Sequence, residues 1–180
     1  FLIADFQQEW GRCNMAANYI AAYAAYQFPQ RERVENLIST VTNELLETAV
    51  TLIGERFNLY YTQIYLLDSR SQTLRMQAGT GEVGRELFAR AHYLPVGKGS
   101  INGVVAAEKT AVVIEDTQND ETFLPNPLLP YTRSEIAIPL LVGTQLIGTL
   151  NLQSDQLGVL TKKNIITFNV NNLIHVMSSR

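Results

Sequence analysis

Residues 94–116 read LPVGKGSINGVVAAEKTAVVIED, and this stretch carries the local signals that decide the fold. Its glycine-rich turn ends in Ser100, a residue type that favours helix N-termini, so a short helix is predicted over residues 101–108. The apolar run at 111–115 predicts a buried strand, and residues 92–96 are expected to be extended. The stretch therefore places one helix between two segments of a sheet.

On the N-terminal side of this stretch the apolar period is two. Residues 59–67 (LYYTQIYLL) and 73–78 (TLRMQA) predict two antiparallel strands joined by a polar turn, and a helix is expected over residues 81–91. That helix opens within GTGEVG at 79–84, which is formally G-x-G-x-x-G. A dinucleotide site would also need a parallel βαβ unit and an acid about 20 residues further on. Because the hairpin is antiparallel, we assign the glycines to a turn with positive φ.

On the C-terminal side, residues 117–130 contain three prolines and little periodicity. An irregular segment of this length is typical of a ligand lid or a packing flap. Residues 135–142 and 145–152 predict a second hairpin, and a final helix is expected over residues 162–177.

Two helical segments precede the first strand. Residues 4–28 are rich in alanine and aromatic residues at spacings of three and four, Pro29 interrupts the pattern, and residues 32–55 carry a broad apolar stripe. We expect residues 1–30 to form an N-terminal helical extension, and residues 31–180 to form one domain that includes the long first helix and the C-terminal helix. The order of elements predicts an α+β fold, a mostly antiparallel sheet flanked by helices.

Composition narrows the possible functions. The 180 residues are 46% hydrophobic and 17% charged, with a formal net charge of -3, so nucleic acid is not expected as the main partner. The single cysteine, Cys13, excludes an internal disulfide and fits a reducing compartment, and no apolar run reaches the length of a membrane span. We therefore expect a cytoplasmic protein. Because the chain opens on Phe1 and both ends have helical patterns, we interpret it as a fragment of a longer protein.

Catalytic and metal signatures do not appear in the sequence. Neither His92 nor His175 has a second ligand residue at metal-binding spacing, and the common hydrolase, metalloprotease and phosphate-loop motifs are missing. We expect no catalytic residue, no metal and no cofactor, and interpret the protein as a non-enzyme.

Five motifs, in this order and spacing, resemble the GAF domain family, most closely the GAF modules of bacterial multi-domain sensors, over about residues 45–180. They are FNLYYTQIYLLD, AGTGEVGRELF, LPVGKGSINGVVAAEKTAVVIED, FLPNPLLPYTRSEIAIPL and LIGTLNLQSD. The resemblance implies an antiparallel sheet with a small-molecule pocket, roofed by the helix and loop between its middle strands. It also implies long terminal helices that often pair into a dimer, and a regulatory role.

Departures from the family pattern limit what this module is expected to bind. The stretch at 160–164 (LTKKN) lacks the acidic pair of the phosphodiesterase GAF domains, so cyclic nucleotide binding is not expected. The GAF-like block has no cysteine, so neither covalent pigment attachment nor the methionine sulfoxide reduction of some small GAF proteins is expected there. Residues 4–47 resemble, more weakly, the helices that precede the nucleotide-binding motif of histidine-kinase-type ATPase folds. There Thr48 replaces the expected asparagine, and a natural fusion, an engineered junction and a coincidence all stay open.

The pocket that the resemblance implies is expected between the sheet and residues 97–104 and 116–130, with Phe123 as its lid. The polar groups around Arg133 have two interpretations, either the rim of this pocket or an ion-pair network, joined by Asp120, that fixes the loop to the sheet. The expected ligand-binding residues are Tyr65, His92, Ser100, Val104, Asp116, Phe123, Leu124, Arg133 and Glu135.

The leading hypothesis is a non-enzymatic sensory or regulatory GAF module that binds an unknown small molecule, dimerises, or does both, and relays a signal to an output domain. The alternative is a structural dimerisation module without a ligand. A homodimer is expected through Val34, Ile38 and Leu46 together with the side of the C-terminal helix that carries Asn172, His175 and Ser179. Folding back of the helix at 4–28 over this stripe within one chain is the competing arrangement.

Overall fold

The computed structural model describes residues 31–142 and 144–162. The helix predicted over residues 4–28, nearly all of the one predicted over 162–177, and Cys13 and His175 lie outside these residues. The chain divides into two compact units, Leu46–Ile166 and a second made of Phe1–Leu45 with Thr167–Arg180. Within the second unit the described part is helical, and the sheet and the site belong to the first.

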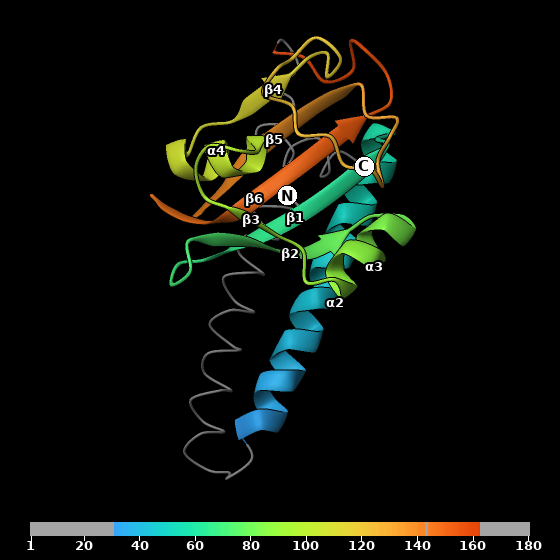
Figure 1. Cartoon of the computed structure of the whole chain (residues 1–180). Coiled ribbons are helices and arrows are strands. Elements are labelled where there is room, and N and C mark those ends of the chain that lie inside the picture. Colours follow the sequence, from blue (N-terminus) through green and yellow to red (C-terminus); the bar gives the residue numbers. More distant parts are fainter. Residues whose placement is uncertain (1–30, 143, 163–180) are drawn as a thin grey trace. The chain divides into compact units, whose positions relative to one another are not determined.

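Leu46–Ile166 is built around one six-stranded antiparallel sheet, drawn in Figure 1. The strand order is β3-β2-β1-β6-β5-β4, with β1 and β6 at the centre. The α+β prediction is therefore confirmed. The elements are α2 (Arg31–Phe57), β1 (Tyr61–Asp68), β2 (Thr73–Gly79), α3 (Gly81–Ala89), β3 (Tyr93–Pro95), α4 (Ile101–Glu108), β4 (Val112–Ile114), β5 (Ser134–Val142) and β6 (Gln145–Ser154).

Every strand and helix predicted within the described residues is present, and no bound differs by more than two residues. The prediction of a buried strand at 111–115 is only partly correct. β4 is an edge strand of three residues, and only Ile114 in it is fully buried. β3 forms the opposite edge and also has three residues. The apolar sequence of β4 predicted burial, but its position in the sheet depends on pairing with β5, which no local pattern encodes.

The buried face of α2 differs from the predicted one. Leu46 was expected at a dimer surface, yet it is 3% exposed and shares one side of the helix with the buried Val50 and Ile53. Leu52 was expected to face the domain and is 45% exposed. The apolar stripe of this helix is so wide that the sequence allows two rotations of the helix about its axis. Tertiary contacts determine which of the two is adopted. The side chains of Val34 and Ile38 lie outside the described part of the chain.

Strands β1 and β6 are buried on both faces. Residues 61–65 of β1 and 148–154 of β6 are all buried. The even-numbered residues of both strands, such as Ile64, Leu150 and Leu152, are mostly apolar, whereas the opposite face carries polar side chains. Since successive residues point to opposite faces of a sheet, each central strand presents one apolar and one polar buried row. The polar row positions the site described below.

The glycines at 79–84 have two structural roles. Gly81 has a φ of +67°, which agrees with the predicted turn. Gly84 instead allows α3 to approach β2, because a Cβ atom at this position would meet the backbone oxygen of Gly79. This close packing brings Leu87 into an apolar cluster with Tyr61, Tyr65, Leu74 and Met76.

Candidate functional site

One buried face of strands β1, β6 and β5 carries a group of polar side chains. Gln63 lies opposite Asn151 in the register of β1 and β6, and Glu135 lies opposite Gln153 in the register of β5 and β6. All four residues are buried. Strand pairing thus brings together polar residues from three separate parts of the sequence, at the centre of the sheet.

Hydrogen bonds link these side chains in a defined direction. The hydroxyl of Tyr65 donates to Oε1 of Gln63 at 3.2 Å, and Nε2 of Gln63 donates to Oδ1 of Asn151 at 3.0 Å. Nδ2 of Asn151 then donates to Oε1 of Glu135 at 2.7 Å. Each group accepts from the one before it and donates to the next, so this arm ends at the carboxylate.

A second arm reaches the same carboxylate from the C-terminal end of β6. The hydroxyl of Thr132 donates to Oε1 of Gln153 at 2.7 Å, and Nε2 of Gln153 donates to Oδ1 of Asn151 at 2.9 Å. Asn151 therefore accepts from two amides and passes one hydrogen bond to Glu135. Both arms direct their donors toward the single acidic group of the network.

Glu135 is only 5% exposed, although glutamate is rarely buried without a charged partner. Burial raises the pKa of its carboxyl to about 7, while the hydrogen bond from Asn151 opposes this shift. In the part of the chain that the structure describes, Asn151 is the only hydrogen-bond partner of the carboxylate. Near neutral pH the group is therefore poised between its ionised and protonated forms.

Helix α4 closes one side of this polar face. Its first turn is fixed by Ser100, whose hydroxyl oxygen accepts a hydrogen bond from the backbone N–H of Gly103 at 3.0 Å, as the sequence predicted. Asn102 follows and accepts a hydrogen bond from the hydroxyl of Thr149 on β6 at 3.1 Å. A Cβ atom at Gly103 would meet the backbone oxygens of Pro95 and Gly97, so glycine lets the helix begin close to the preceding turn.

The loop between β4 and β5, residues 115–133, closes the other side, and we call it the roof loop. Three of its turns are fixed by side-chain oxygens that accept backbone N–H groups two residues on, at Asp116, Asp120 and Asn126. Its two ends are joined where the N–H of Thr117 donates to the carbonyl of Arg133 at 2.9 Å. The loop is therefore held by its own hydrogen bonds.

Arg133 and Asp116 form an ion pair at 3.6 Å within the same loop. The pKa of Asp116 is lowered mainly by the hydrogen bond from the N–H of Gln118, with Asn119 and Arg133 adding to it. This pair matches the ion-pair interpretation of the Arg133 region. Glu135, two residues further on, points to a different partner, Asn151. Asp120 has no ion pair among the described residues, so its role is local to the loop.

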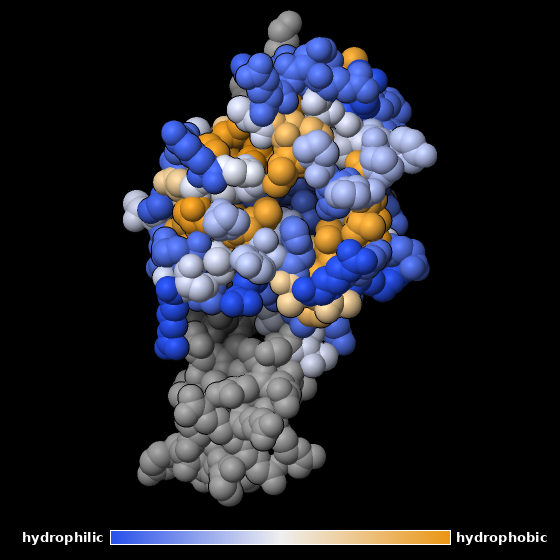
Figure 2. Space-filling view, viewed as in Figure 1, coloured by the Kyte–Doolittle hydropathy of each residue, from blue (hydrophilic) through white to orange (hydrophobic). Residues whose placement is uncertain are grey.

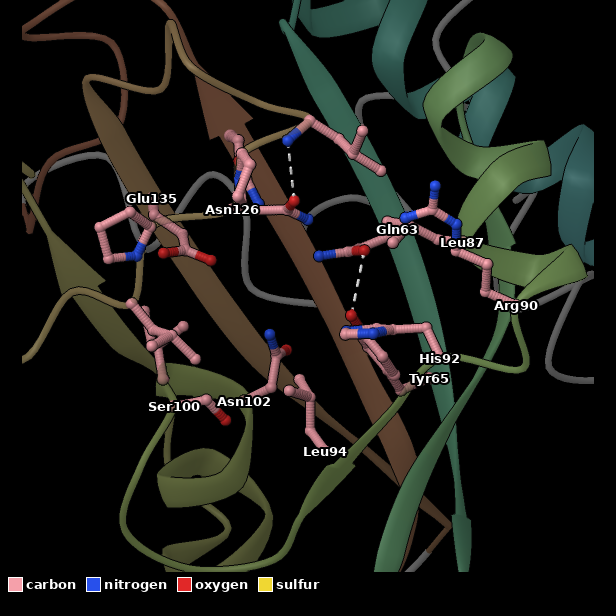
Figure 3. A pocket seen from close by; sticks show the side chains of 16 residues that line it. Gln63, Tyr65, Leu87, Arg90, His92, Leu94, Ser100, Asn102, Asn126 and Glu135 are labelled. Atoms are coloured by element: carbon pink, nitrogen blue, oxygen red, sulfur yellow. Dashed lines mark hydrogen bonds between the residues drawn. The ribbon is translucent and has the colours of Figure 1, made fainter.

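Between the sheet, α4 and the roof loop lies a cavity of about 340 Å³, shown in Figure 3. This volume lies near the lower end of the range for small-molecule sites. The side chains of Glu135, Asn102 and Asn126 approach it from three different elements (Figure 3). The lining residues are Gln63, Tyr65, Leu87, Arg90, His92, Leu94, Ser100, Ile101, Asn102, Leu124, Pro125, Asn126, Pro127, Leu128, Glu135 and Gln153.

Five of the nine residues expected to bind a ligand line this cavity. They are Tyr65, His92, Ser100, Leu124 and Glu135. The other four, Val104, Asp116, Phe123 and Arg133, lie elsewhere. Val104 is one turn further along α4, and Asp116 and Arg133 pair with each other.

Phe123, expected as a lid, instead packs against the apolar cluster of Ile101, Val105, Ile114 and Ala137. The neighbouring Leu124 lines the cavity and is 57% exposed. The local sequence places one apolar side chain of the roof loop over the cavity, but it does not distinguish two adjacent apolar residues in an irregular segment.

The polar residues of the sheet were missed by sequence reasoning. Gln63, Asn151 and Gln153 alternate with apolar residues along their strands, and this pattern ordinarily predicts a solvent-facing row. A partial signal was present in β6, where Thr149, Asn151 and Gln153 are polar at alternate positions. Only the cross-strand register shows that these rows meet under a roof.

Two basic side chains stand at the cavity opposite Glu135. The guanidinium of Arg90 is paired with Glu86 and is mostly exposed. His92 is partly buried, its ring centroid is 6.1 Å from that of Tyr65, and burial lowers its pKa. At neutral pH the imidazole is therefore uncharged. Neither residue has a contact with Glu135 in the described part of the chain.

The protein is thus an α+β domain in which a helix and a loop cover a cavity on one face of an antiparallel sheet. The sequence profile of the GAF domain family matches residues 36–169, and the chain is a member of that family. The resemblance inferred from the five motifs is thus confirmed. None of the curated proteins compared shows a significant sequence match.

Solved structures share the fold at low sequence identity. The free methionine-R-sulfoxide reductase of Neisseria meningitidis, solved with its substrate, has a TM-score of 0.61 at 21% identity, covering 74% of this chain and 76% of that one. The type II free methionine-R-sulfoxide reductase of Thermoplasma acidophilum has a TM-score of 0.60 at 15% identity, covering 77% and 92%. The GAF domain of an Acinetobacter phosphoenolpyruvate-protein phosphotransferase has a TM-score of 0.55 at 20% identity, covering 76% and 81%.

Other kinds of site were sought in the same residues. Within 31–142 and 144–162, no group of three or more His, Cys, Asp or Glu side chains is arranged to hold a metal ion. Among the helices of the described part, none is long and apolar enough to cross a membrane. Figure 2 shows hydrophobic residues in several separate groups on the viewed face, with hydrophilic residues between them.

Proposed function

We propose that this chain is a sensory or regulatory GAF module of a bacterial signalling protein, and that it binds one small molecule in the cavity between the sheet, α4 and the roof loop. The observation that carries the proposal is Glu135, a buried carboxylate at the cavity wall with Asn151 as its only hydrogen-bond partner among the described residues. A buried acid with spare hydrogen-bonding capacity costs stability unless another group satisfies it. A bound molecule would supply that group.

The structure of the roof supports binding without large rearrangement. The turns at Asp116, Asp120 and Asn126 hold the loop, and the cap at Ser100 holds α4. Most ligand sites are pre-formed in this manner, with apolar walls and a few convergent polar groups. The expected binding residues Tyr65, His92, Ser100, Leu124 and Glu135 belong to this proposal.

We propose binding without turnover. Some proteins of the same fold reduce free methionine-R-sulfoxide, which makes an enzymatic role the principal competitor. Reduction of a sulfoxide requires a two-electron donor, and the only thiol of this chain, Cys13, lies outside the residues matched by the family profile. Dimerisation and a cytoplasmic location, both expected from the sequence, remain parts of the proposal.

Native mass spectrometry of the freshly purified chain tests the binding proposal. A retained molecule at one per chain is expected, and Leu94→Trp, which enlarges a cavity-lining side chain, should abolish it. Leu157→Trp is the matched control, because Leu157 is exposed and does not line the cavity. Absence of any retained mass, together with no thermal stabilisation by a metabolite panel, would leave the ligand-free dimerisation module.

An activity assay tests the proposed absence of turnover. The purified chain is incubated with free methionine-R-sulfoxide and an excess of dithiol, and the formation of methionine is followed. We expect no rate above the protein-free reaction. Multiple turnovers that disappear in Leu94→Trp would establish an enzyme and overturn this part of the proposal.

A further inference from the structure

Glu135 is the last acceptor of a hydrogen-bond network in which all donors point in the same direction along the chain of side chains. Starting from Tyr65 and from Thr132, every side-chain hydrogen bond of the two arms points its donor toward this carboxylate. Such an arrangement favours negative charge on Glu135, because the last donor, the amide of Asn151, stabilises the ionised form. The network delivers one donor, whereas a carboxylate has two oxygens and about four acceptor positions.

Within residues 31–142 and 144–162, no basic side chain pairs with this carboxylate. Of the two basic residues at the cavity, Arg90 is paired with Glu86, and His92 is uncharged at neutral pH. Arg133, close in sequence, is paired with Asp116. Buried charges are ordinarily paired, so Glu135 stands out as an acid whose counter-charge is missing from the described residues.

The rest of the cavity wall combines apolar and polar side chains. Its apolar part is formed by Leu87, Leu94, Ile101, Leu124 and Leu128 together with two prolines, and the uncharged polar side chains of Gln63, Ser100, Asn102, Asn126 and Gln153 lie between them. There is no second acidic residue in the lining, and no unpaired cation that could receive a carboxylate or phosphate. The site therefore presents one acidic group at its sheet end, with apolar side chains and uncharged amides around it.

We propose that the molecule bound here is a compact organic monocation, an amine or amidine with an apolar body and no acidic group, whose positive end pairs with the carboxylate of Glu135. This inference rests on the proposed function and names the ligand class for the same cavity. An ammonium or amidinium group donates charge-assisted hydrogen bonds to a carboxylate, which are stronger than neutral ones. Nucleotides, carboxylic acids and amino acids are expected to bind more weakly, because the only lining cation, Arg90, is already paired with Glu86.

Binding of a cation has a consequence for protons. Burial raises the pKa of Glu135 to about 7, so part of the free protein carries a proton there near neutral pH. The ionisable groups that face it across the cavity are Tyr65, His92 and Arg90, and burial raises the pKa of Tyr65 and lowers the pKa of His92. A bound ammonium would favour the ionised carboxylate and release the proton. Affinity should rise about tenfold per pH unit below 7 and level off above it.

The decisive experiment compares molecules of one shape and different charge. Cyclohexylamine, cyclohexanol, cyclohexanecarboxylate and a matched cyclohexyl amino acid are titrated at millimolar concentration into ligand-free protein, with the melting temperature and calorimetry as readouts. The same comparison is repeated with benzyl and n-hexyl bodies. The amines are expected to stabilise the protein, and the alcohols, acids and amino acids are not.

Two variants locate the effect. Glu135→Gln keeps an acceptor for Asn151 but removes the charge, and should weaken amine binding about 10- to 100-fold and abolish its pH dependence. Glu108→Gln is the control, since Glu108 is exposed at the end of α4 and outside the cavity. Should Glu135→Gln fail to fold, the pH dependence and proton release of the unaltered protein still decide the question.

The outcomes separate this inference from the proposed function. A retained molecule that proves neutral or anionic, or alcohols that bind as well as amines, would overturn the cation proposal while the binding module stands. If no molecule of any charge binds, both the proposed ligand binding and the cation proposal are wrong. Amine binding that persists unchanged in Glu135→Gln would overturn the cation proposal as well.

Discussion

Gln63 and Asn151 face each other across strands β1 and β6, and their side chains are joined by a buried hydrogen bond of 3.0 Å although 88 positions separate them in the chain. The pair lies at the centre of the sheet, where both strands are covered on both faces. A long-range polar contact of this kind is satisfied only in one strand register. The pair therefore couples the alignment of the sheet to the geometry of the site.

Removing one partner of this pair should destabilise the fold. Gln63→Ala leaves Asn151 and the hydroxyl of Tyr65 each short of a buried partner, so the free energy of unfolding should fall by about 2–3 kcal/mol. Urea denaturation measures the change. Gln118→Ala, at an exposed residue of the roof loop, should stay within about 0.5 kcal/mol of the parent. Equal effects of the two substitutions would contradict a structural role for the pair.

Stability should depend on pH through Glu135. Its carboxyl pKa is about 7 in the folded chain and near 4.5 when unfolded, so the folded state holds the extra proton between these values. Stability therefore decreases as pH rises from about 4.5 to about 7, by an amount on the order of 3 kcal/mol, and is constant above that range.

Glu135→Gln removes this titration and is expected to raise the free energy of unfolding at pH 8 while leaving it nearly unchanged at pH 4. Chemical denaturation of the ligand-free protein across this range, with Glu108→Gln as the control, makes the comparison. A variant that retains the full pH slope of the parent would show that another group is responsible.

The cap of α4 should contribute measurably to stability. Ser100→Ala removes the acceptor for the N–H of Gly103 and should cost about 1 kcal/mol in the free energy of unfolding. Ser69→Ala is a suitable comparison, because Ser69 is exposed in the turn between β1 and β2. Since Ser100 also lines the cavity, the substitution should weaken ligand retention together with stability. No change in either quantity would contradict this role.

Phe123 and Leu124 should separate stability from binding. Phe123→Ala opens the apolar cluster between α4 and β4, and should lower the free energy of unfolding by about 1–3 kcal/mol with little effect on a retained ligand. Leu124→Ala should do the reverse, because Leu124 is largely exposed at the cavity. Melting temperature and native mass spectrometry of the two variants give both quantities. A loss of ligand in Phe123→Ala at unchanged stability would restore its predicted role as a lid.

Most of the sheet could be predicted from sequence because its elements are marked locally. Ser100 marks the start of α4, the polar turns mark both hairpins, and residues 117–130 lack any period. The orientation of α2 could not be predicted in this way. Leu46 and Leu52 are both leucines on one broad stripe, and only the tertiary contacts of the fold bury the first and leave the second exposed.

The site was predicted less completely than the fold. Segments that the family resemblance placed near a pocket supplied Ser100 and Leu124, and the rim interpretation of the Arg133 region supplied Glu135. Asn151 and Gln153, which complete the network, follow from strand register, and a polar residue beside a leucine has the same local sequence whether it faces water or a roofed cavity. The ion pair of Arg133 with Asp116 depends on the closure of the loop, which is also a long-range property.

The two edges of the sheet limit how the domain can associate with other chains. β3 and β4 offer only three residues each for main-chain pairing, and each is already bonded on its inner side to β2 or β5. A strand added from outside would gain few hydrogen bonds, and short edge strands are one means by which proteins avoid such growth. Filament-like extension of the sheet is thereby disfavoured, and any self-association of this unit has to use side-chain surfaces in place of backbone pairing.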